Sequence, residues 1–203
     1  MVAKRHVKDK VEYDSMETQI GISELRAAQR LFRQDHKQGW DALDHLFRSG
    51  IPPEPMLNGR YAGELVGFNI APGLTHLFQW LANRWMPWAG KTFNATQQSG
   101  DNIFTRDSYP LARLFNPFYR GFAPEGRETY RCFTFHTYLA PGLADADRTV
   151  LKIDYDLDGN PAPTIRRILD ELVQLDLNLY LGKAHVHWWW GDWQTIVYFM
   201  LSK

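Results

Sequence analysis

His185 and His187 lie one residue apart near the C-terminus, a spacing that could bind a metal ion. On a β-strand alternate side chains point to one side, so both imidazoles could share an ion if a neighbouring strand supplied a third ligand, such as His136. However, Lys183 would place a positive charge on the same face, and no cysteine or carboxylate spacing supports the site. We therefore expect no metal and interpret these histidines as surface or cavity residues.

A second group with chemical potential is formed by Lys152 and Asp154, which alternate with apolar residues in VLKIDYD. Buried together, they could orient a ligand carbonyl or carboxylate, or act as acid and base with shifted pKa values. Exposed, they would form a surface ion-pair network that contributes little to stability, and we favour this interpretation. Charged partners are available from the next element: Arg166, Arg167, Asp170 and Glu171.

The direction of these side chains depends on the C-terminal hairpin. If Gly191-Asp192 is a two-residue turn, Trp190 lies opposite Trp193 and the register is fixed. One face is then almost wholly apolar, with Ala184, Val186, Trp188, Trp190, Trp193, Thr195, Val197 and Phe199. The opposite face is mixed, with Lys183, His185, His187, Trp189, Gln194, Ile196, Tyr198 and Met200. We expect Trp188 and Trp193 in the core, and the mixed face either in solvent or along a cavity.

The elements that position these residues can be predicted from their periodicity. Helical spacing predicts two short amphipathic helices between Gly21 and Phe47, with a weak point near HKQGW, and a further helix from Pro72 to Trp85. RDSYPLARLFNPFYRGFAPEG predicts a long aromatic loop, and TIRRILDELVQ begins as a short helix near Thr164. Strands are predicted for NGRYAGELVGFNI, for two short segments around QQSGDN, and for ETYRCFTFHTYL, RTVLKIDYDL, LNLYLGKAHVHWWW and WQTIVYFMLSK.

Composition excludes several classes of protein. Basic and acidic residues number 23 each, so no overall charge favours nucleic acid or an anionic membrane. A single cysteine favours a reducing compartment, and the sequence has neither a membrane-spanning apolar run nor a secretory signal, so we expect a cytoplasmic protein. A phosphate-binding glycine loop, a nucleophile elbow and a Cys-x-x-Cys pair are also absent. The 12 Phe, 9 Tyr and 8 Trp residues suit either a core or a small-molecule cavity.

The C-terminal third resembles a known barrel. ILDELVQLDLNLYLGKA, a hairpin and then IVYFML resemble the closing strands of lipocalin-like barrels of the calycin type, including uncharacterised bacterial proteins of that class. The resemblance covers roughly residues 130 to 203. Lipocalins proper carry a Gly-x-Trp element in an early strand, where this chain has Gly63-Glu64-Leu65. The resemblance implies a protein that holds a small, mostly apolar ligand inside the barrel.

We therefore predict a mainly β (α+β) fold, an antiparallel lipocalin-like barrel with N-terminal helices and one inserted helix. Residues 1–19 are expected to be a disordered tail, 20–50 a helical extension and 51–203 the barrel domain. The predicted function is binding of a small hydrophobic molecule such as a lipid, isoprenoid or aromatic metabolite, without a cofactor. The candidate ligand-binding residues are His136, Tyr138, Lys152, Asp154, Lys183, His185, His187, Trp189 and Tyr198.

Two alternatives remain open. The first is a cavity enzyme, an isomerase, cyclase or hydrolase, that uses His136, His185, Lys152 and Asp154. The second is an interaction module whose N-terminal amphipathic helices dock a partner or form a homo-oligomer.

Overall fold

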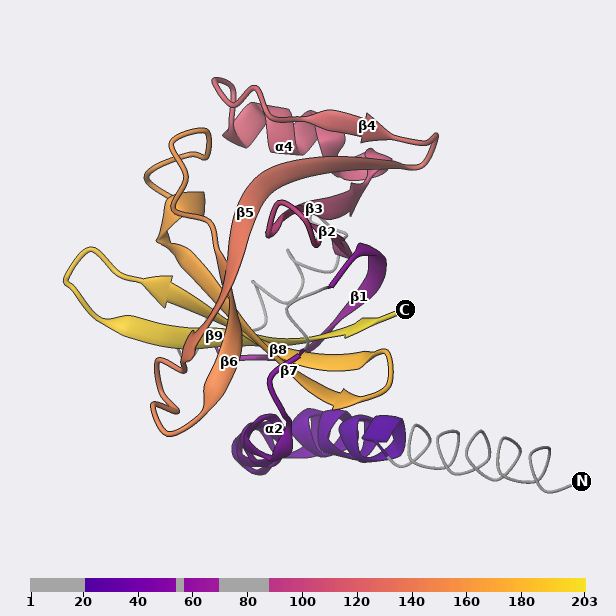
Figure 1. The fold of residues 1–203 in the computed structure, drawn as a ribbon, viewed down its shortest axis with the longest axis vertical. Coiled ribbons are helices and arrows are strands. Elements are labelled where there is room, and N and C mark those ends of the chain that lie inside the picture. The colour runs from indigo at the N-terminus through magenta and orange to yellow at the C-terminus, as the bar shows by residue number, and fades with distance from the viewer. Residues whose placement is uncertain (1–20, 54–56, 70–87) are drawn as a thin grey trace, which may run out of the picture.

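The protein is a mainly β structure in a computed structural model that describes residues 21–53, 57–69 and 88–203 (Figure 1). Two helices come first, over residues 21–34 and in α2 (His36–Ser49), and a short helix α4 (Tyr109–Phe115) comes later. The strands are β1 (Gly59–Phe68), β2 (Trp88–Asn94), β3 (Ser99–Thr105), β4 (Ala123–Glu125), β5 (Thr129–Pro141), β6 (Thr149–Asp154), β7 (Ile168–Asp176), β8 (Leu179–His187) and β9 (Trp193–Ser202).

The strands form one antiparallel sheet that closes on itself. Their order is β3-β2-β1-β9-β8-β7-β6-β5, and β3 also pairs with β5, so eight strands make a closed barrel and β4 extends the edge of β5. Closure removes free sheet edges, and alternate residues of each strand then face the lumen or the outside. The predicted antiparallel β-barrel with N-terminal helices is confirmed.

The lumen is packed with aromatic and aliphatic side chains over much of its length. Tyr61 meets both Phe93 and Tyr180 edge to face, with ring centroids 5.4 and 5.6 Å apart. Phe135 similarly contacts Phe93 and Tyr155. Edge-to-face contacts of this kind add to the gain from burying large apolar area. They fill one part of the barrel and leave room elsewhere.

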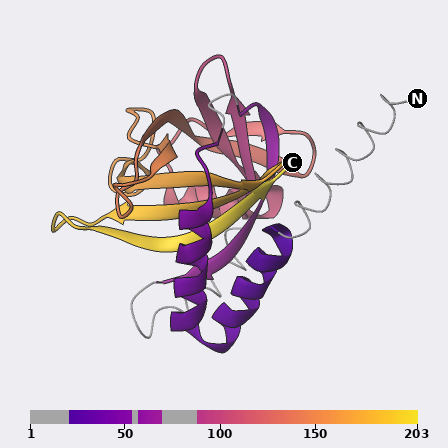
Figure 2. The ribbon, with the colours of Figure 1, turned by 60° about the horizontal axis from the view of Figure 1, so that its bottom comes forward.

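The two N-terminal helices lie against one side of the barrel and cover part of its outer face (Figure 2). Asp35 separates them, and its side chain accepts the backbone N–H of Gln38 to cap α2. The helices approach so closely that a Cβ on Gly39 would lie 2.1 Å from the Cα of Phe32, which explains why glycine stands there. Their apolar stripes pack on β1, β7, β8 and β9 through Leu25, Ala28, Leu43, Phe47, Val66, Val173, Leu181, Tyr198 and Met200. No helix among the described residues is long and apolar enough to cross a membrane.

Three expectations about local structure differ from what is observed or are not tested. The helix predicted from Pro72 to Trp85 falls within 70–87, outside the described residues. The predicted aromatic loop contains α4 and β4. In TIRRILDELVQ only Ile165–Arg167 is helical, and the rest belongs to β7. Both faces of this strand are buried, with Leu172 in the lumen and Val173 in the core beneath α2. A strand buried on both faces lacks a clear alternation of apolar and polar residues, so its sequence can be mistaken for a helix.

The predicted register of the C-terminal hairpin is wrong. His187 is paired with Trp193, so residues 188–192 form a longer loop, and a bulge follows Ala184. Backbone hydrogen bonds close this loop, from the N–H of Trp188 to the carbonyl of Asp192 at 2.8 Å and from the N–H of Gly191 to the carbonyl of Trp188 at 3.0 Å, and Gly191 adopts a positive φ within it. The loop therefore projects into solvent, where Trp189 is 72% and Trp190 61% exposed. Trp193, expected in the core, is also exposed.

Candidate functional site

The barrel contains a cavity of about 230 Å³ that is partly open at its surface. Most of its wall is apolar, and aromatic rings from β1, β2, β3, β5 and β9 contribute. Among the described residues the lining consists of Leu65, Phe68, Trp88, Lys91, Asn102, Phe104, Phe133, Tyr155, Ile165, Ile168, Asp170, Ala184, Ile196, Val197 and Phe199. Four of these are polar, and they lie together.

These four residues, which we call the lumen cluster, are Lys91, Asn102, Tyr155 and Asp170. Lys91 on β2 is the cross-strand partner of Asn102 on β3, so their side chains leave the sheet side by side on its inner face. Tyr155 follows the last residue of β6, and Asp170 is the third residue of β7. Because the sheet is closed, the two pairs meet across the lumen.

Hydrogen bonds join every member of the lumen cluster. The ammonium of Lys91 donates to Oδ1 of Asn102 and to Oδ2 of Asp170, both at 2.8 Å, and to the hydroxyl of Tyr155. Tyr155 donates to Oδ2 of Asp170 at 3.0 Å and accepts from Nδ2 of Asn102 at 3.0 Å. The Trp88 indole donates to Oδ1 of Asn102 at 3.1 Å.

The lumen cluster is neutral overall and almost completely buried. Lys91 and Asp170 are 2% and 4% exposed, and Nζ of Lys91 lies 5.1–5.5 Å from the ring centroids of Trp88, Phe135, Tyr155 and Phe199. Burial lowers the pKa of Lys91, while the charge of Asp170 and its hydrogen bond oppose this effect. Burial and the same carboxylate hold the pKa of Tyr155 well above its usual range.

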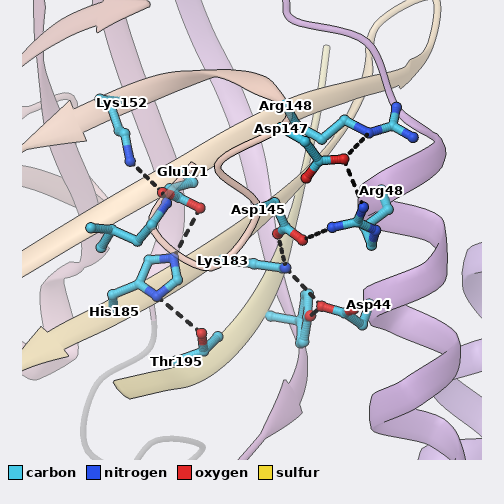
Figure 3. Close-up of polar contacts among 12 residues, drawn as sticks. Asp44, Arg48, Asp145, Asp147, Arg148, Lys152, Glu171, Lys183, His185 and Thr195 are labelled. Carbon is cyan, nitrogen blue, oxygen red and sulfur yellow. Dashed lines mark hydrogen bonds and ion pairs between the residues drawn. The ribbon is translucent and has the colours of Figure 1, made fainter. Parts of the chain in front are cut away.

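None of the nine residues predicted to bind ligand lines this cavity. Several instead form a belt across the outer face of neighbouring strands, where Tyr138 is paired with Lys152, Lys152 with Glu171, Glu171 with Lys183 and Lys183 with Tyr198. Helix α2 and the loop between β5 and β6 cover the middle of this belt (Figure 3). Ligand contact by the nine residues stays a prediction.

Glu171 is the fully buried centre of the belt. Its Oε1 accepts from the ammonium of Lys152 and, at 2.6 Å, from the backbone N–H of Leu143. Its Oε2 lies 3.1 Å from Nε2 of His185, whose Nδ1 lies 3.0 Å from the hydroxyl of Thr195 (Figure 3). Burial alone would raise the pKa of Glu171, but the contacts with His185, Lys152 and Leu143 lower it to about 2.

Lys183 ties the barrel to α2 and to the loop between β5 and β6. Its ammonium donates to Asp44 of α2 at 2.7 Å and to Asp145 of the loop at 2.6 Å (Figure 3). The hydroxyl of Tyr198 also donates to Asp44, at 2.8 Å, and Arg48 donates to Asp145. Burial and the charge of Asp44 raise the pKa of Tyr198 above its usual range. This network has the geometry of a structural connection between helix and barrel.

The other predicted site residues are accessible. His136 is exposed on β5 and paired with Asp154 on β6, and Tyr138 donates to Asp154 at 3.2 Å. His187 stacks on Trp193 with 4.8 Å between ring centroids. Since β6 and β7 separate β5 from β8, the structure does not bring His136 to His185. The described residues contain no group of three that could hold a metal ion.

Of the lumen cluster, the sequence interpretation considered only Asp170 for a site, as a partner for Lys152 and Asp154, and it placed Tyr155 on the apolar face of its strand. A signal existed for two others, because Lys91 and Asn102 each stand two positions before a phenylalanine, Phe93 and Phe104. On a strand this spacing puts the polar group on the buried aromatic face. A lysine or asparagine on such a face must find partners inside the protein.

A comparison of the chain with protein-family models, curated proteins and solved structures found no match in any of the three. Fold and site geometry therefore carry the functional argument.

Proposed function

We propose that this protein binds a small, mostly apolar molecule inside the barrel. The supporting observation is a cavity walled by aliphatic and aromatic side chains, with its polar groups gathered in the lumen cluster. Ligand sites typically combine an apolar wall, which supplies affinity, with a few fixed polar groups, which orient the ligand. Filled lumens of small barrels offer no such space.

The size of the cavity limits the ligand. An apolar cavity of about 150 Å³ holds benzene, so about 230 Å³ suits a molecule of roughly two fused rings or a short branched chain. A complete long-chain lipid exceeds this volume. Among the ligand classes considered from the sequence, a small aromatic or isoprenoid-sized molecule fits best.

The closed eight-stranded antiparallel barrel is compatible with the calycin type that the C-terminal sequence resembles. That resemblance implies ligand binding in the lumen and adds to the proposal. The single, buried cysteine fits a reducing, cytoplasmic location, which we include in the proposal.

The proposal can be tested by filling the cavity. Ala184 lines it, so Ala184→Phe would occupy the space with a ring, whereas Ala140→Phe adds the same ring to β5, away from the cavity. Protein purified under native conditions would be analysed by native mass spectrometry and by solvent extraction. We expect wild type and Ala140→Phe to carry or take up a small apolar molecule and Ala184→Phe to lose it. A folded Ala184→Phe variant that retains the same molecule would refute binding in the lumen.

A further inference from the structure

The lumen cluster leaves very little hydrogen-bonding capacity unused. A lysine ammonium has three N–H donors, and those of Lys91 match three acceptors, on Asn102, Tyr155 and Asp170. The hydroxyl oxygen of Tyr155 lies 3.0 Å from Oδ2 of Asp170 and 3.3 Å from Oδ1 of Asn102, so its one proton is best donated to Asp170. Its oxygen accepts from Lys91 and Asn102. Both residues are therefore saturated.

Asn102 is saturated as well. Its Oδ1 accepts from Lys91 and from the Trp88 indole, and its Nδ2 donates to Tyr155 and, at 3.3 Å, to the backbone carbonyl of Phe133. An amide has two lone pairs and two N–H groups. No donor of Lys91, Tyr155 or Asn102 is left for a ligand.

Asp170 differs from its three neighbours. Both hydrogen bonds that its side chain makes to the described residues end on Oδ2. Its side chain lines the cavity and is 6% exposed. Oδ1 has no partner among the described residues and is not sealed off inside the protein, so a molecule in the cavity can reach it. The unused polar capacity of the lumen cluster is therefore an acceptor, Oδ1 of Asp170.

We propose that the molecule held in the cavity carries one uncharged hydrogen-bond donor, a hydroxyl or N–H group, which Oδ1 of Asp170 accepts. This inference rests on the proposed function and adds the chemical class of the ligand. A carboxylate ligand is disfavoured because it would meet Asp170 without a free donor from Lys91. An ammonium ligand would bring a net charge into a neutral, apolar cavity, which costs desolvation energy that one shared carboxylate does not offset.

The test uses three bicyclic probes of similar shape. Indole has an N–H donor, benzofuran replaces it with an oxygen, and indole-2-carboxylate keeps the N–H but adds a negative charge. Isothermal titration calorimetry with the full-length protein would give the three dissociation constants at pH 7. Because a hydrogen bond to a buried carboxylate is stronger than one between neutral groups, we expect indole to bind at least tenfold more tightly than benzofuran. Indole-2-carboxylate should bind most weakly.

Each result separates the inference from the function on which it rests. Equal binding of indole and benzofuran would overturn the role of Asp170 while leaving ligand binding intact. If indole-2-carboxylate bound most tightly, the role of Asp170 would also be overturned, and the result would show that the ammonium of Lys91 contacts the ligand. Binding of none of the probes would overturn both proposals for molecules of this size.

Variants localise the effect. In Asp170→Asn the donors of Lys91 and Tyr155 hold the amide oxygen and turn the NH2 group toward the ligand, so indole and benzofuran should bind about equally. Asp156→Asn, which neutralises an exposed carboxylate next to Tyr155, should keep the tenfold preference. If Asp170→Asn does not fold because Lys91 loses its charged partner, Lys91→Met combined with Asp170→Asn removes both charges and serves instead. A tenfold preference that survives in either Asp170 variant would contradict the inference.

Discussion

Lys91 and Asp170 form a buried ion pair in the lumen, with 2.8 Å between Nζ and Oδ2 although 79 residues separate them in the chain. β1, β9 and β8 lie between their strands on one side of the barrel, and β3, β5 and β6 on the other. The pair therefore reports that the sheet has closed. It also places a carboxylate where an apolar ligand would lie.

The first prediction concerns the stability of this pair. Asp170→Asn leaves a buried ammonium without its counter-charge and should lower the free energy of unfolding by about 3 kcal/mol or more at pH 7. Replacing both charges, with Lys91→Met and Asp170→Asn together, should cost less than the single change because no buried charge then remains. Urea denaturation measures both values. A double variant less stable than Asp170→Asn would contradict this account.

The second prediction concerns acid stability. The pKa of Glu171 is lowered from 4.5 to about 2, so its ionised form stabilises the fold above pH 4.5, and this stabilisation is lost as the pH falls through 2. The difference corresponds to roughly 3 kcal/mol. We expect the unfolding free energy of wild type to decline more steeply between pH 4.5 and 2 than that of Glu171→Gln. The exposed Glu128→Gln variant should follow wild type, and parallel curves for wild type and Glu171→Gln would count against the assignment.

The third prediction separates a buried ion pair from an exposed one. Lys183→Met removes the common partner of Asp44 and Asp145, leaves the buried Asp145 with Arg48 alone, and should cost about 3 kcal/mol. Lys37→Met removes a pair with Asp41 in which the lysine side chain is 86% exposed, so solvent screens the pair and its loss should change the stability far less. Thermal and urea unfolding measure both, and equal losses would show that the connection through Lys183 is not structural.

The fourth prediction concerns Cys132, which is fully buried in the barrel wall. Burial, assisted by the charge of Asp101, raises the pKa of its thiol, so little reactive thiolate forms at neutral pH. A thiol reagent such as dithionitrobenzoate should react with the folded protein only at the rate of unfolding and at once in urea. Rapid reaction of the native protein would mean that this part of the barrel opens.

Local periodicity in the sequence predicted the two N-terminal helices and most of the strands, but not β4 or β7, since period-two alternation and helical stripes depend on near neighbours alone. It separated the faces of Ala184 and Lys183 correctly, because alternate side chains of a strand must point in opposite directions. The pairing register of β8 with β9 was predicted wrongly, because it depends on the length of the loop between them and on the bulge after Ala184.

What the sequence by itself determined is therefore a mainly β fold of antiparallel strands preceded by helices, and the expectation of a barrel came from the resemblance of its C-terminal third. Only the tertiary structure decided which face of the sheet is the lumen, because α2 and the loop between β5 and β6 cover part of the opposite face, where Glu171, Lys183 and His185 are buried (Figure 3). It alone decided the site, because closure of the barrel brings Lys91 and Asp170 together from strands that are not neighbours. Spacing along a chain records the direction of a side chain, whereas contact across a lumen depends on every strand between.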